Sequence, residues 1–149
     1  MQLDRAQLDV LLLKQKRAHG WSGFQKRDNQ ANYLIGISQL TDSEGVFIPG
    51  LTLEIEVKAP IMVERCLIFF TLRERAIGKR PRLYQLEVCP RDKRSRNGVT
   101  VIYGPHEHFL DDEPRAVTEM SVNCDDWEAS LDWFLKRVKV VDLKVGRPW

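Results

Sequence analysis

The sequence has little net charge, few cysteines and no long apolar run, and each shortage excludes a class of protein. A formal net charge of +2 excludes a polycation that binds nucleic acid through bulk charge alone. The three cysteines are odd in number and form no Cys-x-x-Cys pair, so we expect no disulfide framework and predict a cytoplasmic location. The longest apolar run, Cys66 to Phe70, is far shorter than the roughly 18 residues of a membrane-spanning helix.

Several familiar motifs are missing as well. The chain contains no glycine-rich phosphate loop, no Gly-x-Ser-x-Gly nucleophile turn and no zinc ribbon. Its first residues lack the basic and apolar regions of a signal peptide. With 149 residues, 43% of them hydrophobic, the chain is long enough to fold around its own core, and we assign residues 1–149 to a single domain.

What the sequence does contain is a clear hydrophobic periodicity. Asp4 and Gln7 form a capping-box signature, which predicts a helix over about residues 4–18, with His19 on its apolar face. A second such signature at Asp125 predicts a C-terminal helix. Apolar alternation between turn residues predicts strands at residues 33–40, 51–58, 83–89, 99–103 and 140–145. The segment 65–72 is apolar on both faces, which predicts a central strand.

Short turns between successive strands favour antiparallel pairing, because parallel neighbours need long crossover connections. We therefore expect an α+β domain: a twisted antiparallel sheet of five to six strands with an N-terminal and a C-terminal helix packed on one face. In the C-terminal helix Trp133 points away from the apolar face, so we expect a partner or another segment to cover it.

The small net charge conceals two segments of opposite charge. Residues 73–96 carry nine basic and three acidic side chains, a net +6, whereas residues 106–132 carry nine acidic and one basic, a net −8. The guanidinium group of arginine binds phosphate well, so one interpretation of the basic segment is a surface that contacts phosphate. The other interpretation is that these residues make the loops soluble or pair with the acidic segment. The loops before and after the strand at 83–89 lie at its opposite ends, so no single basic patch is implied. The candidate contacts are Arg80, Arg82, Arg91, Arg94 and Arg96.

The run Tyr-Gly-Pro-His-Glu-His, which begins at Tyr103, holds two of the three histidines. In an extended stretch His106 and His108 project to one side and Glu107 to the other. Three interpretations stay open: histidines bonded to backbone in a long loop, an acid and a base for phosphodiester cleavage, or two metal ligands. Because no third ligand stands at a fixed spacing, we predict no metal and no cofactor. A nucleophile pair of Cys89 with His106 is a further alternative.

Several of these segments resemble one group of proteins. The strand at 83–88, the basic loop, the Tyr-Gly-Pro-His-Glu-His run and the segment from Asp126 to Leu135 are similar to small uncharacterised bacterial proteins that carry Pro-His-x-His between a sheet and a closing helix. The resemblance covers mainly residues 80–140. It implies a mobile-element or defence-type setting, with the two histidines as a shared feature, and it implies no activity.

Two functions follow as hypotheses. The first is a cytoplasmic binding module that contacts nucleic acid or a protein partner through the five arginines and the off-face tryptophan. The second is a small metal-independent ribonuclease of toxin type, with His106 and His108 as base and acid, Tyr103 as a hydrogen-bond donor and Arg82 or Arg96 at the phosphate. A homodimer that joins acidic and basic segments is a third arrangement, and no membrane association is expected.

Overall fold

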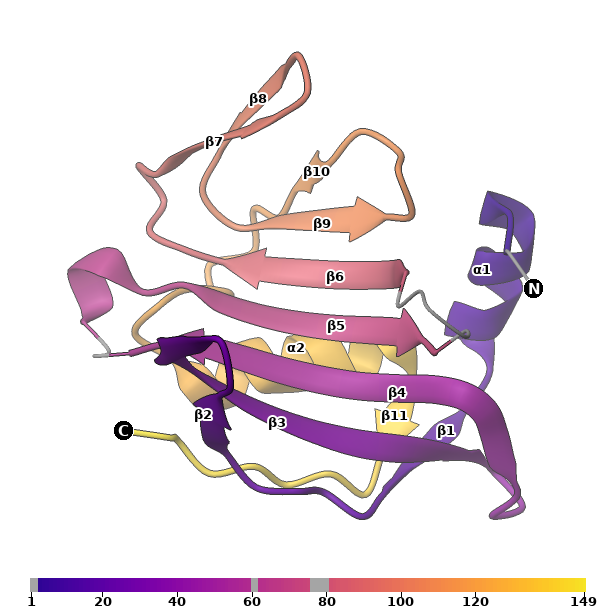
Figure 1. Ribbon diagram of the computed structural model, residues 1–149. Coiled ribbons are helices and arrows are strands. Elements are labelled where there is room, and N and C mark those ends of the chain that lie inside the picture. Colours follow the sequence, from indigo (N-terminus) through magenta and orange to yellow (C-terminus); the bar gives the residue numbers. More distant parts are fainter. Residues whose placement is uncertain (1–2, 60–61, 76–80) are drawn as a thin grey trace.

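The computed structural model describes residues 3–59, 62–75 and 81–149, and an antiparallel sheet is its central feature (Figure 1). Within these ranges nine strands form one sheet in the order β10-β9-β6-β5-β4-β3-β1-β11, with β2 paired to β3. Only β1 and β11 run parallel. The elements are α1 (Arg5–Leu13), β1 (Lys16–His19), β2 (Gln25–Arg27), β3 (Gln30–Asp42), β4 (Phe47–Lys58), a 3₁₀ turn (Val63–Arg65), β5 (Ile68–Glu74), β6 (Arg82–Val88), β7 (Arg94–Asn97), β8 (Thr100–Tyr103), β9 (His106–Phe109), β10 (Arg115–Ala116), α2 (Trp127–Val138) and β11 (Val140–Val141).

The long hairpin of β3 and β4 forms because its sequence alternates and its turn is well specified. In β4 the apolar residues Leu53, Ile55 and Val57 are all buried on one face. At the turn the Asp42 carboxylate accepts hydrogen bonds from the backbone N–H groups of residues 44 and 46, at 2.9 and 3.0 Å, and Gly45 has a φ of 83°. The strand predicted at 51–58 is thereby confirmed and extended towards the turn.

Helix α2 lies across one face of this sheet and closes the core (Figure 1). The Phe134 ring stacks on Phe70 of β5 and Tyr84 of β6, with centroids 5.2 and 6.1 Å apart. The helix begins one residue later than its capping signature predicts: the side chain of Asp126, not Asp125, accepts a hydrogen bond from the Ala129 N–H.

Helix α1 is shorter than the sequence predicts. Its Asp4 capping box is present, but the helix ends at Leu13, and residues 16–19 pair with β3 and β11 as strand β1. The prediction that His19 lies on a helical apolar face is therefore wrong, because His19 is exposed on β1 and contacts Phe47 edge-on at 5.1 Å. The pairing of β1 with two strands that are distant in sequence replaces the local helical preference.

The α+β class with a mostly antiparallel sheet is confirmed, whereas the details of the prediction are not. The sheet has nine strands among the described residues rather than five to six, since the two- to four-residue strands carry too little alternation to detect. Helix α1 lies beside the strand ends rather than across a face (Figure 1). Trp133, which was expected to need a partner or another segment to cover it, is half-buried and packs against the core of the chain itself. Neither α-helix of the described ranges is long and apolar enough to cross a membrane.

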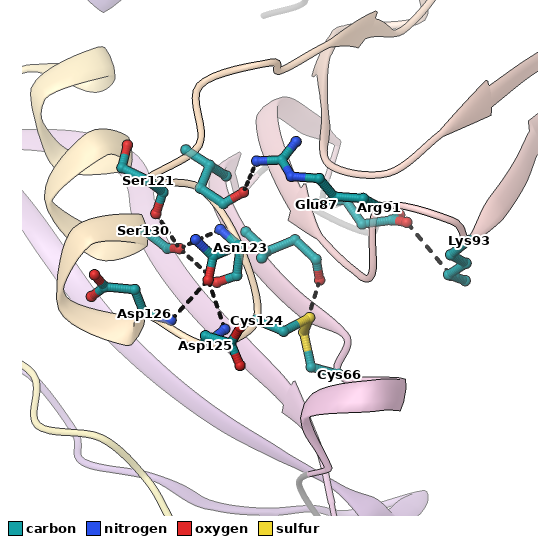
Figure 2. The surroundings of a disulfide bond; sticks show 12 residues. Cys66, Glu87, Arg91, Lys93, Ser121, Asn123, Cys124, Asp125, Asp126 and Ser130 are labelled. Atoms are coloured by element: carbon teal, nitrogen blue, oxygen red, sulfur yellow. Dashed lines mark hydrogen bonds and ion pairs between the residues drawn. A yellow bond between two sulfur atoms is a disulfide. The ribbon is translucent and has the colours of Figure 1, made fainter.

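A disulfide bond joins Cys66, just before β5, to Cys124, just before α2 (Figure 2). The expectation of no disulfide is therefore wrong. The two cysteines are 58 residues apart in sequence, but the packing of α2 on the sheet brings their Cα atoms to 5.8 Å, a separation suited to a disulfide. Cys89 is left as a buried free thiol.

Lys16 is a fully buried cation that joins the C-terminal ends of both helices. Its ammonium donates hydrogen bonds to the carbonyl oxygens of Lys14 and Val138, at 2.6 and 2.7 Å. Carbonyls at helix ends carry partial negative charge, so this position suits a cation. Burial, together with the charges of Lys14 and Lys139, nevertheless lowers the pKa of Lys16 to about 8.

Removing the disulfide is expected to destabilise the fold. Replacing Cys66 and Cys124 together with alanine frees a loop of 58 residues in the unfolded chain, which corresponds to about 4 kcal/mol in the chain-entropy relation. Urea unfolding of the wild type with and without dithiothreitol, beside the double variant, measures the difference. A wild-type midpoint that does not respond to the reductant would contradict the prediction.

The buried Lys16 predicts a rise in stability at alkaline pH. Because its folded-state pKa of about 8 lies below the ordinary 10.5, the folded protein releases this proton first, and the free energy of unfolding gains about 3 kcal/mol as pH rises through that interval. Urea unfolding at pH 7, 8, 9 and 10 should show this contribution in the wild type and in the exposed-site control Lys26→Met. Lys16→Met should lack it, and parallel profiles for all three proteins would disprove the assignment.

Candidate functional site

The sheet face opposite α2, here called the polar face, carries a continuous set of polar side chains. Along β4 and β5, Arg73 donates to the Glu54 carboxylate at 2.7 Å. Between β5 and β6, the Gln85 amide donates to the Thr71 hydroxyl at 2.9 Å. Although they face away from the core, Glu54, Thr71 and Gln85 are all buried, because neighbouring side chains cover one another on the pleated surface.

At the β9 end of this face, His106 and His108 lie beside Glu87 of β6. Glu87 and His106 are direct cross-strand partners, and His108 lies two residues further along β9. The two imidazole centroids are 4.8 Å apart, and His106 Nε2 lies 3.6 Å from a carboxylate oxygen of Glu87. One potential ligand atom from each of the three residues lies within 4.8 Å of the other two. We call these three residues the Glu87 cluster.

Both imidazoles are almost fully buried, with exposed fractions of 2% for His106 and 5% for His108. His106 Nδ1 lies 2.8 Å from the carbonyl oxygen of Gly104, which fixes the ring. Burial, the charge of Arg82 and the neighbouring His106 lower the pKa of His108 to about 4, so this ring is neutral at pH 7. Among the described residues His108 Nδ1 has no hydrogen-bond partner.

Glu107 points into the core, on the opposite side of β9 from the two histidines. One of its carboxylate oxygens accepts hydrogen bonds from the Tyr84 hydroxyl and from Arg137 Nε of α2, each at 2.7 Å. Burial and the adjacent carboxylate raise the pKa of Tyr84 well above its ordinary range, so the phenol stays protonated. This triad ties β9, β6 and α2 together.

Strands β7 and β8 form a hairpin that projects beyond β9 (Figure 1). One face of this hairpin is basic and exposed. Arg94 pairs with Tyr103 and Arg96 with Val101, so these four side chains share one face of the hairpin, which we call the ribbon face. All four are exposed, Tyr103 by 59% and Val101 by 39%. The hairpin closes at Gly98, whose φ is 63°.

Arg91 and Arg82, two of the other predicted contact residues, lie apart from this face. One guanidinium nitrogen of Arg91, which is labelled in Figure 2, donates hydrogen bonds to the carbonyl oxygens of Glu119 and Val122, at 2.9 and 3.0 Å, so this side chain anchors a loop. Arg82 is half-buried at the far end of β6 and donates to Gln85 at 3.1 Å. Arg80 lies outside the described residues. The basic segment is therefore not one surface.

The predicted catalytic set is brought together only in part. His106 and His108 share one side of β9, as the alternation predicts. Tyr103 lies instead on the ribbon face, and no hydrogen bond within the described ranges joins it to either imidazole. Burial raises the pKa of the Cys89 thiol to about 11, which removes support for a nucleophile pair with His106.

Glu87 is the member of the cluster that sequence reasoning missed. In the sequence it is one of the three acidic residues of the basic segment at 73–96. The inward set Tyr84, Leu86 and Val88 places Glu87 on the other face of its strand, but only the pairing of β6 with β9 puts it opposite His106. That pairing joins residues separated by the whole β7–β8 hairpin, and no periodicity reports it.

Comparisons with known proteins yield no relative: no family model matches the chain, and no curated protein or solved structure matches it. The resemblance to Pro-His-x-His proteins therefore stays a hypothesis.

The Glu107 triad makes a prediction about stability. Glu107→Gln removes the charge that accepts both hydrogen bonds and should lower the free energy of unfolding by roughly 2–3 kcal/mol, while Tyr84→Phe should cost about 1–2 kcal/mol. In the double variant the loss of unfolding free energy should be smaller than the sum of the two single losses, because both substitutions remove the same hydrogen bond to one carboxylate oxygen. Urea unfolding measures these changes against Glu44→Gln, an exposed control expected within about 0.5 kcal/mol of wild type. Full additivity would contradict the triad.

Proposed function

We propose that this chain is a nucleic-acid-binding module whose contact surface is the ribbon face of β7 and β8. The observation that carries the proposal is the composition of that face: two arginines, a tyrosine and a valine, all exposed, on a projecting hairpin. In the described part of the chain neither Arg94 nor Arg96 has an ion-pair partner. Both guanidinium groups are therefore available to phosphate.

The shape of the hairpin suits a nucleic acid. A two-stranded ribbon fits the major groove of a duplex, which is about 12 Å wide. Arginine contacts with phosphate supply affinity, and an exposed tyrosine supplies a stacking surface for an unpaired base. The single short ribbon offers few charges, so we expect binding that is strong only at low salt.

A protein partner is the other occupant to consider. Arginine and tyrosine are enriched at protein interfaces as well, so the residue types of the ribbon face suit either partner. The face is small, however, with four side chains on two short strands, whereas a specific protein interface takes about 20–30 residues from each partner. The small size favours nucleic acid, and a protein partner is an outcome of the test below.

The ribonuclease alternative receives less support from the geometry. An acid/base pair must reach the substrate, and both imidazoles are almost fully buried. A His108 pKa of about 4 is also poorly matched to proton transfer near neutral pH. Tyr103, the expected hydrogen-bond donor, lies on the ribbon face instead.

The mobile-element or defence-type setting depends on the resemblance alone. The cytoplasmic location was predicted from unpaired cysteines, and the Cys66–Cys124 disulfide removes that argument. Homodimer formation stays a prediction that size-exclusion chromatography with light scattering tests.

The binding proposal predicts a salt-sensitive interaction that depends on two arginines. At about 50 mM salt, wild type should shift labelled duplex DNA, single-stranded DNA or RNA in fluorescence anisotropy. Arg94→Ser with Arg96→Ser should weaken binding at least about ten-fold and reduce the slope of log affinity against log salt by about two. Tyr103→Ala should weaken binding to single strands and leave the duplex affinity unchanged.

A matched control removes two positive charges elsewhere. Arg65 and Lys144 are exposed and lie outside the hairpin, so Arg65→Ser with Lys144→Ser should bind like wild type. Equal loss in both double variants would indicate bulk charge rather than a site. No binding to any of the three nucleic acids would overturn the proposal and leave a protein partner. If the wild type cleaves the RNA, and the Arg94→Ser with Arg96→Ser variant still cleaves it, the ribonuclease alternative would be favoured.

A further inference from the structure

In the Glu87 cluster, the hydrogen bonds of the surrounding residues do not account for all of the imidazole nitrogens and carboxylate oxygens. The Gly104 carbonyl oxygen accepts a hydrogen bond, so His106 Nδ1 carries a proton. When the ring is neutral, His106 Nε2 then presents a lone pair to a Glu87 oxygen 3.6 Å away. Two acceptors face each other there, an arrangement that needs a proton or a metal cation between them.

His108 supplies a second unexplained atom. Its Nδ1 is buried and has no partner among the described residues, although buried polar atoms are normally hydrogen-bonded. The His106 and His108 rings lie 4.8 Å apart and nearly perpendicular, at 77°. A buried imidazole nitrogen without a partner, close to a second imidazole and a carboxylate, is the kind of ligand group that holds a metal ion.

We propose that Glu87, His106 and His108 bind one divalent transition-metal cation of the zinc type. Two imidazoles and one carboxylate form a common protein ligand set for zinc and its neighbours in the first transition row. A tetrahedral ion with bonds of about 2.0–2.1 Å holds its ligand atoms roughly 3.4 Å apart. The observed 3.6 Å between His106 Nε2 and a Glu87 oxygen is close to this value. The ligand atoms of the three residues lie within 4.8 Å of one another, so the widest pair would approach by roughly 1.4 Å on binding.

The surroundings define the character of the site. The carbonyl of Gly104 orients the His106 ring, the role that outer-shell acceptors play for metal-binding histidines. Lys93 Nζ lies 3.7 Å from the second oxygen of Glu87, and the Arg82 charge acts on His108. These two cations oppose a bound cation, so affinity is expected to be lower than in a thiolate site. Water is left to complete the coordination.

A metal ion bound here would hold two segments of the chain together. Glu87 is near the end of β6, before the segment that leads to β7, and His106 begins β9 after the segment that follows β8. The ion would therefore join the two chain segments from which the hairpin projects. The inference does not depend on nucleic-acid binding, because metal affinity is measured in the absence of any nucleic acid.

The test uses the full chain after chelator treatment, titrated with zinc chloride or cobalt chloride. We expect one equivalent to bind, visible absorption of protein-bound Co²⁺, and a rise in melting temperature of about 5–10 °C when zinc is 100 times its Kd. Glu87→Gln and His108→Asn should each weaken binding at least about ten-fold. His19→Ala removes the remaining histidine, exposed on β1, and should bind like wild type.

A measurement on the wild type guards against variants that do not fold. Side-chain ¹⁵N spectra of the three histidines should show zinc-dependent shifts at His106 and His108 and none at His19. The proposal is overturned if zinc leaves all three spectra unchanged, or if folded Glu87→Gln and His108→Asn bind as tightly as wild type. A doubly protonated His106 that persists with zinc would identify a simple imidazolium–carboxylate pair instead.

Discussion

The hydrogen bonds of Glu107 to Tyr84 and Arg137 fix the register on which the candidate sites depend. Strand β9 has only four residues, so its backbone pairing with β6 is short. A slip of one residue would move the Glu107 carboxylate to the polar face and turn both imidazoles into the core. Because Glu107 finds a phenol and a guanidinium only on the core side, that slip would leave charged groups unpaired, and the observed register is strongly preferred.

The alternation of the strands also determines which residues suit the polar face. Side chains that alternate with the core positions point to this face, and several of them are buried there, so they need hydrogen-bond partners. Arg73 with Glu54 and Gln85 with Thr71 supply such partners to each other. The buried polar atoms left without a partner in the described ranges belong to Glu74, Ser95 and His108. Of these, only His108 lies within a group of metal-ligating side chains. The proposed metal ion would give His108 the partner that the described residues do not supply.

Sequence reasoning succeeded where the signal was local and failed where it was not. The alternation of Leu51 to Val57, the capping residue Asp4 and the common side of His106 and His108 are set by neighbouring residues, and the structure agrees with each. The strand β1, the disulfide and the place of Glu87 in the cluster each need two segments far apart in sequence. Hydrophobic periodicity contains no information about which strands pair, so the elements were predictable and most of their partners were not.

The division of charge illustrates this difference most clearly. The +6 of residues 73–96 does not become a surface of charge +6, because several of its described cations make separate contacts within the fold. Arg91 donates to backbone carbonyls, Arg73 and Lys93 lie against carboxylates, and Arg82 is half-buried beside an amide. Arg94 and Arg96, on the projecting β7–β8 hairpin, have no such neighbour in the described part of the chain. A near-neutral protein thus presents two unpaired arginines on one face of a short hairpin, while several other cations of the same segment are bound within the fold.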